Sequence, residues 1–223
     1  MTHSDDDGLV LPPRLAPSHV VIMPITFKAD DPEAIQAYCR KLADDLRSQA
    51  WLGRPLDVEL DERDIRGGEK TWSWIKKGVP IRLEIGPRDM ESDSVFMGRR
   101  DKSPKDKESV GRERFLSDVH SILDEMQQGC FDRALAFREE HTRDIDSREE
   151  FESFFASPEG EPTPIHGGFA RTHFCGDPGI EEQIKNDLGV TIRCMPLDAD
   201  QDPGTCPFSG QPSTQRVTWG KSY

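Results

Sequence analysis

Three side chains within one short stretch have the chemistry needed to read the edges of nucleic-acid bases: Arg82, Arg88 and Asp89. The forked guanidinium group of an arginine can bind N7 and O6 of guanine through two hydrogen bonds. A carboxylate can accept hydrogen bonds from the N1 and N2 edge of guanine when the base is unpaired. An alternative for Arg82 is an ion pair with Glu84, which lies two residues further along and therefore on the same face of a strand.

A strand predicted over residues 81–86 positions these groups. Within it, apolar residues at every second position alternate with Arg82 and Glu84, which places the apolar side chains on one face. A Gly-Pro pair then ends the strand and leaves Arg88 and Asp89 at its carboxyl end. Binding sites of α/β sheets are usually found at that end of the strands.

The surrounding sequence predicts an α/β fold with a mixed, mainly parallel sheet that is flanked by helices over about 17–110. Apolar runs and alternation predict the other strands of this part, and apolar residues at helical spacing predict its helices, one of which begins at Asp31. Residues 111–223 are predicted to form a long helix and a small α+β domain, with the helix interrupted or kinked at Gly129. The predicted strands lie over 20–25, 56–60, 81–86, 94–100, 167–174, 190–194 and 216–219. The predicted helices lie over 31–46 and 111–140, after Ser147 and over 177–188, and residues 61–77 are predicted to form a turn and a short helix.

The composition limits the classes of partner. The chain has 223 residues and a net charge of −13, which argues against general DNA or RNA binding, because phosphate contacts need a basic surface. Residues 63–107 are an exception, with 12 Lys and Arg against 8 Asp and Glu. This local excess suits a protein that touches RNA in one place, although a solvated charged face would have the same composition.

The five cysteines are irregularly spaced and do not form a disulfide pattern. The sequence has neither a signal-peptide pattern nor an apolar run of about 18 residues that could span a membrane. We therefore expect a cytoplasmic protein with no membrane partner.

The string KKGVPIRLEIGPRD, over residues 76–89, resembles the KGVPxRxEIGPRD signature of the anticodon-binding domain in prolyl-tRNA synthetases of the archaeal and eukaryotic type. Residues 5–17, 136–151 and 220–223 are similar to other segments of this family, so the resemblance covers almost the whole chain. The sequence departs from the family at Ser4, where a glycine is usual, and at Ile75, where an acidic residue is usual.

The resemblance implies that Arg82, Arg88 and Asp89 read the two invariant guanines of the proline anticodon in tRNA(Pro), and that Lys107 is a further basic contact. The catalytic motifs of the family lie upstream of the segment that matches 1–16. We therefore expect this segment to be a linker from a missing catalytic domain, and the chain to be the carboxyl-terminal half of a longer enzyme. The complete enzyme would be a homodimer that joins proline to tRNA with ATP and magnesium, whereas this fragment would need no cofactor and would be inactive.

The small domain of the family often binds zinc through four cysteines spaced C-x4-C and C-x2-C. The matching positions here are Cys175, Ile180, Cys206 and Ser209, so that only two of four ligands remain. Structural zinc nearly always takes four ligands, and we expect no zinc in this chain. We also expect no disulfide between the two cysteines in a cytoplasmic protein.

Two other classes of function remain open from the sequence. The chain could be a free-standing, non-catalytic paralogue that binds RNA or a protein partner, which an in-frame catalytic domain upstream of Met1 would exclude. It could also be a thiol-based or zinc-dependent regulatory module, a possibility that rests on Cys175 and Cys206 alone. The family resemblance further predicts that the terminal Tyr223 docks on the catalytic domain of the complete enzyme.

Overall fold

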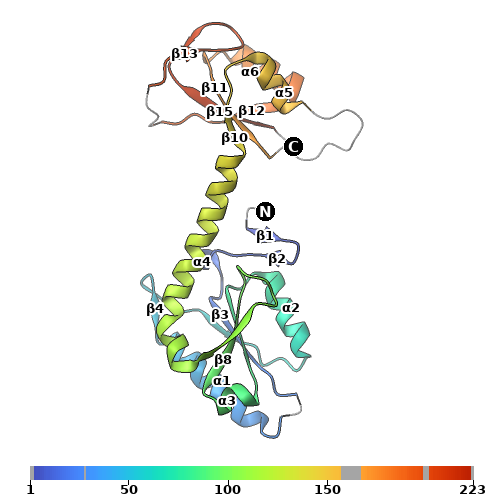
Figure 1. Cartoon of the computed structure of the whole chain (residues 1–223), viewed down its shortest axis with the longest axis vertical. Helices are drawn as coiled ribbons and strands as arrows, with labels where there is room; N and C mark the ends of the chain where they lie inside the picture. Colours follow the sequence, from blue (N-terminus) through green and yellow to red (C-terminus); the bar gives the residue numbers. More distant parts are fainter. Residues whose placement is uncertain (1–2, 28, 157–166, 198–200, 222–223) are drawn as a thin grey trace. The chain divides into compact units, whose positions relative to one another are not determined.

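The computed structural model describes residues 3–27, 29–156, 167–197 and 201–221, so the terminal Tyr223 lies outside the described residues. The chain forms two compact units, and the boundary between them falls after Ala134 (Figure 1). It lies inside the long helix α4 (Arg112–Glu140).

The first unit is built on a five-stranded mixed sheet, which confirms the predicted fold class. Strand β3 (Val20–Pro24) is parallel to both its neighbours, whereas the pairings of β7 (Ile81–Ile85) with β8 (Ser94–Arg99) and of β8 with β9 (Lys107–Gly111) are antiparallel. The sequence does not predict β9, because its residues KESVG lack a regular apolar alternation. The strand order is β6 (Val58–Leu60), β3, β7, β8 and β9.

Helices cover both faces of this sheet, which explains why every residue of β3 is buried. Apolar residues of α1 (Pro32–Arg47) and of the first half of α4 share one core with the odd-numbered residues of β7. On the other face, α2 (Gly67–Lys77) packs Trp74 against Val21 and Met23. In Figure 1, α2 lies on the opposite side of the sheet from α4.

The helix boundaries follow local signals in the sequence. Asp31 Oδ1 accepts a hydrogen bond of 2.9 Å from the amide of Ala34, as expected for the residue that caps α1. At the end of α2, Gly78 adopts a φ of 75°, a left-handed conformation that glycine accommodates without strain. The predicted interruption of α4 at Gly129 is wrong, because the helix continues through this residue to Glu140.

The amino-terminal segment, for which the sequence predicts a linker, packs against the first unit. It contains the hairpin of β1 (Ser4–Asp5) and β2 (Gly8–Leu9) and a 3-10 turn over Pro13–Leu15. Elsewhere in the first unit, a second hairpin of β4 (Ala50–Trp51) and β5 (Arg54–Pro55) follows α1. Arg100, which is 2% exposed, donates hydrogen bonds of 2.7 and 2.5 Å to the carboxylate of Asp5. This buried guanidinium therefore ties the segment to the sheet.

The second unit has a four-stranded sheet in the order β10 (Thr142–Asp144), β11 (Phe169–His173), β15 (Arg216–Lys221) and β12 (Val190–Cys194). Helices α5 (Arg148–Phe155) and α6 (Pro178–Leu188) and a hairpin of β13 (Gly204–Thr205) and β14 (Pro212–Ser213) complete the unit. Aromatic side chains dominate its core, where Phe151 and Phe174 each pack edge-on against Trp219.

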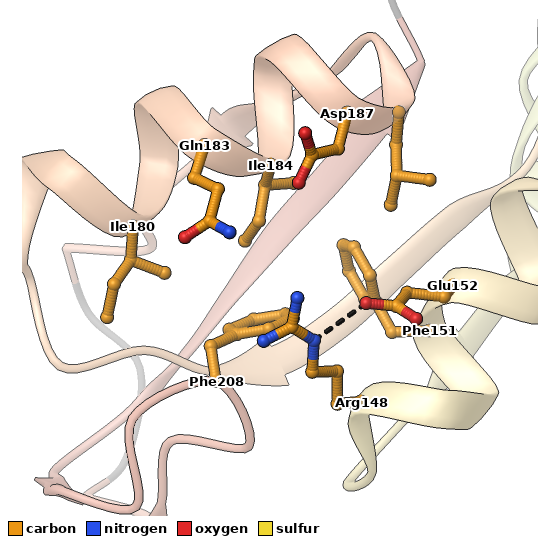
Figure 2. A pocket seen from close by; sticks show the side chains of 9 residues that line it. Arg148, Phe151, Glu152, Ile180, Gln183, Ile184, Asp187 and Phe208 are labelled. Carbon is orange, nitrogen blue, oxygen red and sulfur yellow. Dashed lines mark hydrogen bonds and ion pairs between the residues drawn. The ribbon is translucent and has the colours of Figure 1, made fainter.

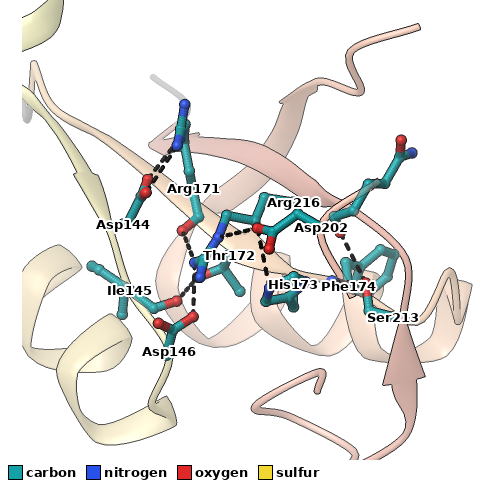
Figure 3. Close-up of polar contacts among 11 residues, drawn as sticks. Asp144, Ile145, Asp146, Arg171, Thr172, His173, Phe174, Asp202, Ser213 and Arg216 are labelled. Carbon is teal, nitrogen blue, oxygen red and sulfur yellow. Dashed lines mark hydrogen bonds and ion pairs between the residues drawn. The ribbon is translucent and has the colours of Figure 1, made fainter. Parts of the chain in front are cut away.

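Polar contacts join the strands of this second sheet across its surface (Figure 3). Arg171 on β11 donates two hydrogen bonds, of 2.6 and 2.8 Å, to Asp144 on β10. Arg216 on β15 forms ion pairs with Asp146 at 2.7 Å and with Asp202 at 3.0 Å.

Among the described residues, no helix is both long enough and apolar enough to cross a membrane.

Candidate nucleic-acid interface

The face of the first sheet that carries α2 also carries two of the predicted site residues in a single row. Arg82 on β7 lies opposite Gly98 on β8, and Gly98 lies opposite Lys107 on β9. Residues that face each other across a sheet lie on the same side of it, so Gly98 leaves a gap between the two basic side chains. A Cβ atom at Gly98 would lie 3.1 Å from Nη2 of Arg82 and 3.5 Å from Cγ of Lys107.

Arg82 is 2% exposed, and burial is the main cause that lowers its pKa, to about 10, with a smaller contribution from the nearby Arg100. Its Nε and Nη1 atoms are buried and have no hydrogen-bond partner in the described part of the chain. A buried donor without a partner costs free energy, about 1–3 kcal/mol for a typical group and more for a charged one. The guanidinium therefore carries buried donors that no described residue satisfies.

The described residues contain no ion pair between Arg82 and Glu84, the alternative that the sequence left open for Arg82. Glu84 Oε1 instead accepts hydrogen bonds from Lys107 Nζ at 2.6 Å and from Thr71 Oγ1 at 2.9 Å. Phe96 lies opposite Glu84 on β8, with its ring centre 5.7 Å from the same Lys107 nitrogen. A cation, a carboxylate and a partly exposed aromatic ring thus lie together beside Arg82.

The structure places the other two predicted residues elsewhere, in α3 (Pro87–Glu91), which follows the carboxyl end of β7 and contacts α1. Asp89 is partly buried, and its Oδ2 atom accepts a hydrogen bond of 2.9 Å from the amide of Gly86. Among the described residues, its other carboxylate oxygen, Oδ1, accepts no hydrogen bond. Arg88 is exposed on the same short helix, so it can reach a partner without rearrangement.

Part of the basic excess in residues 63–107 is paired within the first unit, where four of its basic side chains form ion pairs of 2.5–2.8 Å with acidic residues. Six exposed basic side chains form no ion pair among the described residues: Arg66, Lys76, Lys77, Arg88, Lys102 and Lys105. This region therefore keeps exposed cations that can contact phosphates. The four pairs are Arg63 with Asp61, Arg99 with Asp101, Arg100 with Asp5, and Lys107 with Glu84.

A cavity of about 1120 Å³ opens at the carboxyl ends of β3 and β6, beside the first turn of α2. Phe27, which is 84% exposed, contributes an aromatic wall, and Arg63 and Arg66 contribute two basic groups. The sequence reading missed this cavity, because its residues come from three separate segments. Its lining is Pro24, Ile25, Thr26, Phe27, Gln36, Glu62, Arg63, Asp64, Ile65, Arg66, Gly67, Glu69 and Lys70.

The second unit contains the positions that match the zinc ligands of the family. Ile180 on α6 is partly buried and lines a cavity of about 270 Å³ together with Phe208 and with both apolar and charged side chains, as Figure 2 shows. No group of three or more metal-binding side chains occurs in the described residues. Two cysteines beside an isoleucine and a serine do not fit the four-ligand requirement of a structural zinc site.

The two remaining cysteines nevertheless lie at one place in this unit. Ser209 Oγ donates a hydrogen bond to the sulfur of Cys175 at 3.4 Å. Cys206 is completely buried, and although burial raises the pKa of its thiol, hydrogen bonds from Ser209 and from nearby amides, including that of Cys175, lower it overall. The sulfurs of Cys175 and Cys206 thus share Ser209 as a neighbour.

The α/β domain with this mixed sheet, its flanking helices and the short helix α3 is of the anticodon-binding class, as the comparison with family models shows. A family model described as "Anticodon binding domain" matches residues 19–122, and one described as "Prolyl-tRNA synthetase, C-terminal" matches residues 164–223. The chain thus carries an anticodon-binding domain and the carboxyl-terminal domain of prolyl-tRNA synthetases.

Similar proteins agree with this assignment. The chain is 52% identical to "Proline--tRNA ligase 2" of Anaeromyxobacter dehalogenans and 46% identical to "Proline--tRNA ligase" of Bdellovibrio bacteriovorus, in each case over 100% of this chain and 44% of the relative. A crystal structure of prolyl-tRNA synthetase from Cryptosporidium parvum, complexed with L-proline and AMP, superposes with a TM-score of 0.83 at 28% identity, again over 100% of this chain and 44% of that one. The chain therefore spans less than half the length of these proteins.

Proposed function

We propose that the first unit binds the anticodon loop of tRNA(Pro) and distinguishes its guanines from other bases. Arg82 supports this proposal most strongly, because its guanidinium is buried beside Gly98 while two of its nitrogen atoms have no partner in the described residues. Guanine offers N7 and O6 as a pair of acceptors that match such a group. Its binding would satisfy donors that are otherwise left unpaired.

The neighbouring residues have complementary roles in this proposal. Lys107 forms an ion pair with Glu84, and its side-chain stem lies at the same gap beside Gly98 as the Arg82 guanidinium. A base bound in this gap would therefore contact the Lys107 ammonium group. Phe96 provides a flat surface on which an unpaired base can stack. Arg88 and the second carboxylate oxygen of Asp89 would form a separate contact with another nucleotide of the loop.

We further propose that the chain is the carboxyl-terminal part of a proline–tRNA ligase, which as a whole joins proline to tRNA(Pro) with ATP. In that enzyme, ATP and magnesium would bind in the catalytic domain, and the enzyme would act as a homodimer in the cytoplasm. The family match and the similarity to proline–tRNA ligases over 44% of their length support this proposal. The chain by itself would bind RNA without catalysing a reaction.

The binding proposal is tested with an isolated stem-loop that carries the proline anticodon. The chain is titrated with this RNA and with two variants, in each of which one anticodon guanine is replaced by adenine. We expect each replacement to weaken binding by about 1–3 kcal/mol, as for the loss of a direct base contact. Equal affinity for all three loops would contradict base recognition by this unit.

A further inference from the structure

The two cysteines of the second unit lie on different segments that the fold brings together. Cys175 follows β11 and is partly exposed, whereas Cys206 lies in the turn between β13 and β14 and is completely buried. The amide of Cys206 donates to Gln211 O at 2.9 Å, and its carbonyl accepts from the amide of Gly210 at 2.8 Å, so this turn is well ordered by its own hydrogen bonds. The turn thus holds the buried sulfur in a fixed position.

Several contacts hold this turn against the end of β11. Ser213 Oγ accepts a hydrogen bond of 3.2 Å from the amide of Phe174, the residue before Cys175. Ser209 Oγ donates a hydrogen bond to the Cys175 sulfur at 3.4 Å, and both Ser209 and the backbone of Cys175 lie close enough to the Cys206 sulfur to lower the pKa of its thiol. Both sulfurs are therefore within reach of one hydroxyl group, and one of them lies beside the backbone of the other cysteine.

We propose that Cys175 and Cys206 are a reversible thiol pair, which stays reduced in a reducing compartment and forms a disulfide by exchange with a small-molecule disulfide such as oxidised glutathione when that pool becomes oxidised. The expected absence of a disulfide thus applies to the reduced state of the pair. A structural zinc site needs four ligands, whereas a thiol pair needs only the two cysteines that remain at these positions. The thiol pair is independent of tRNA binding, which belongs to the first unit.

The exposures of the two cysteines set the order of the steps. The thiolate of Cys175, which solvent can reach, attacks one sulfur of the small disulfide, forms a mixed disulfide and releases one thiolate. The thiolate of Cys206 then attacks the Cys175 sulfur and releases the second thiolate, which leaves the Cys175–Cys206 bond. Both protein thiols are oxidised, the small disulfide is reduced to two thiols, and the two protons from the cysteines end on those products.

The chain has three other cysteines. Cys39 and Cys130 are buried in the first unit, where burial raises the pKa of each thiol, and Cys194 is exposed on β12. Cys194 is therefore a matched control for an accessible thiol in the same unit.

The test equilibrates the whole folded chain with buffers of reduced and oxidised glutathione, blocks free thiols by alkylation, and maps the disulfides by mass spectrometry without reduction. We expect one internal bond, Cys175–Cys206, in the unaltered chain and in the variant Cys194→Ser. The variant Cys206→Ser should instead accumulate glutathione on Cys175, and Cys175→Ser should leave Cys206 reduced.

The unaltered chain decides the outcome even if a variant fails to fold. A stable mixed disulfide at Cys175 without the internal bond would overturn the proposal, as would a bond from either cysteine to Cys194. Persistent reduction of both thiols in oxidised glutathione would overturn it equally.

Discussion

At the scale of single residues, Arg82 is the most unusual side chain of the first unit. An arginine that is 2% exposed and has two nitrogen atoms without partners in the described residues does not stabilise the fold through its polar groups. Its neighbours explain how it fits, because Gly98 has no side chain and Lys107 is drawn toward Glu84. A function in binding gives this costly arrangement a physical reason.

The gap at Gly98 gives a first prediction. Gly98→Ala would place a Cβ atom 3.1 Å from the Arg82 guanidinium and push it aside, so we expect binding of the anticodon stem-loop to weaken by about 1 kcal/mol, at the lower end of a base contact. Gly111→Ala on the neighbouring strand β9 is the matched control, because nothing lies within 4 Å of its Cβ position. Affinity measured by titration should fall for the first variant alone; a similar loss in both would refute this role of the gap.

A second prediction concerns Arg88, which is exposed on α3. Arg88→Ala should cost about 1–3 kcal/mol of binding and relax discrimination at one guanine, as expected for a base contact with two hydrogen bonds. Arg114→Ala on α4 removes the same charge from an exposed side chain and serves as the control. If Arg88→Ala weakened binding to cognate and altered loops equally, Arg88 would be a phosphate contact and the assignment would fail.

At the scale of elements, Asp61 attaches helix α2 to the sheet. Its buried carboxylate accepts hydrogen bonds from Arg63 Nη2 at 2.6 Å and from Trp74 Nε1 at 2.7 Å, and its carbonyl accepts from Lys70 Nζ at 3.0 Å. Burial raises the pKa of Asp61, but the hydrogen bonds from Arg63 and Trp74 outweigh it and bring the pKa down to about 2. The helix that flanks the candidate interface is thus held by an ionised aspartate.

A third prediction follows from this pKa. Because the folded pKa lies below the unfolded value, the charge of Asp61 contributes stability above about pH 4 that is lost as the pH falls toward 2, about 2 kcal/mol in all. Asp61→Asn should lower the free energy of unfolding at neutral pH by about 1–3 kcal/mol. The side-chain NH2 group of the asparagine cannot accept a hydrogen bond, so one of the donors on Arg63 and Trp74 would be left without an acceptor.

Denaturant unfolding at several pH values checks both parts of this prediction. The difference between the unaltered chain and Asp61→Asn should shrink as the pH is lowered through this range. Asp64→Asn, which alters an exposed aspartate three residues away, should behave like the unaltered chain. A difference that stayed constant with pH would show that the charge of Asp61 does not contribute in this way.

The elements also show what the sequence could and could not predict. The alternation of apolar residues in 81–86 correctly predicted strand β7, and Asp31 correctly marked the start of α1. The burial of Arg82 depends on Gly98 from another strand, so no pattern within β7 reveals it. Gly129 did not interrupt α4, because the cost of a single glycine, about 1 kcal/mol, is small beside the packing of this long helix.

At the scale of the whole molecule, the two units have separate cores of different character. The core of the first unit is largely aliphatic and lies between a sheet and its helices, whereas that of the second is built around Trp219 and several phenylalanines. Aromatic side chains bury large areas, and their edge-on packing adds about 0.5–1.5 kcal/mol for each pair. The second unit therefore has its own source of stability, although two of its four family zinc positions, Ile180 and Ser209, are not cysteines.

The last prediction tests this source of stability. The purified chain should contain far less than one zinc ion per molecule, and a chelator should leave its melting temperature unchanged, because no metal-binding free energy is coupled to folding. A double variant, Ile180→Cys with Ser209→Cys, restores four thiols and should bind one zinc ion and become sensitive to the chelator. Elemental analysis that found one zinc ion per unaltered chain would require other ligands and would contradict a second unit held together by its aromatic core alone.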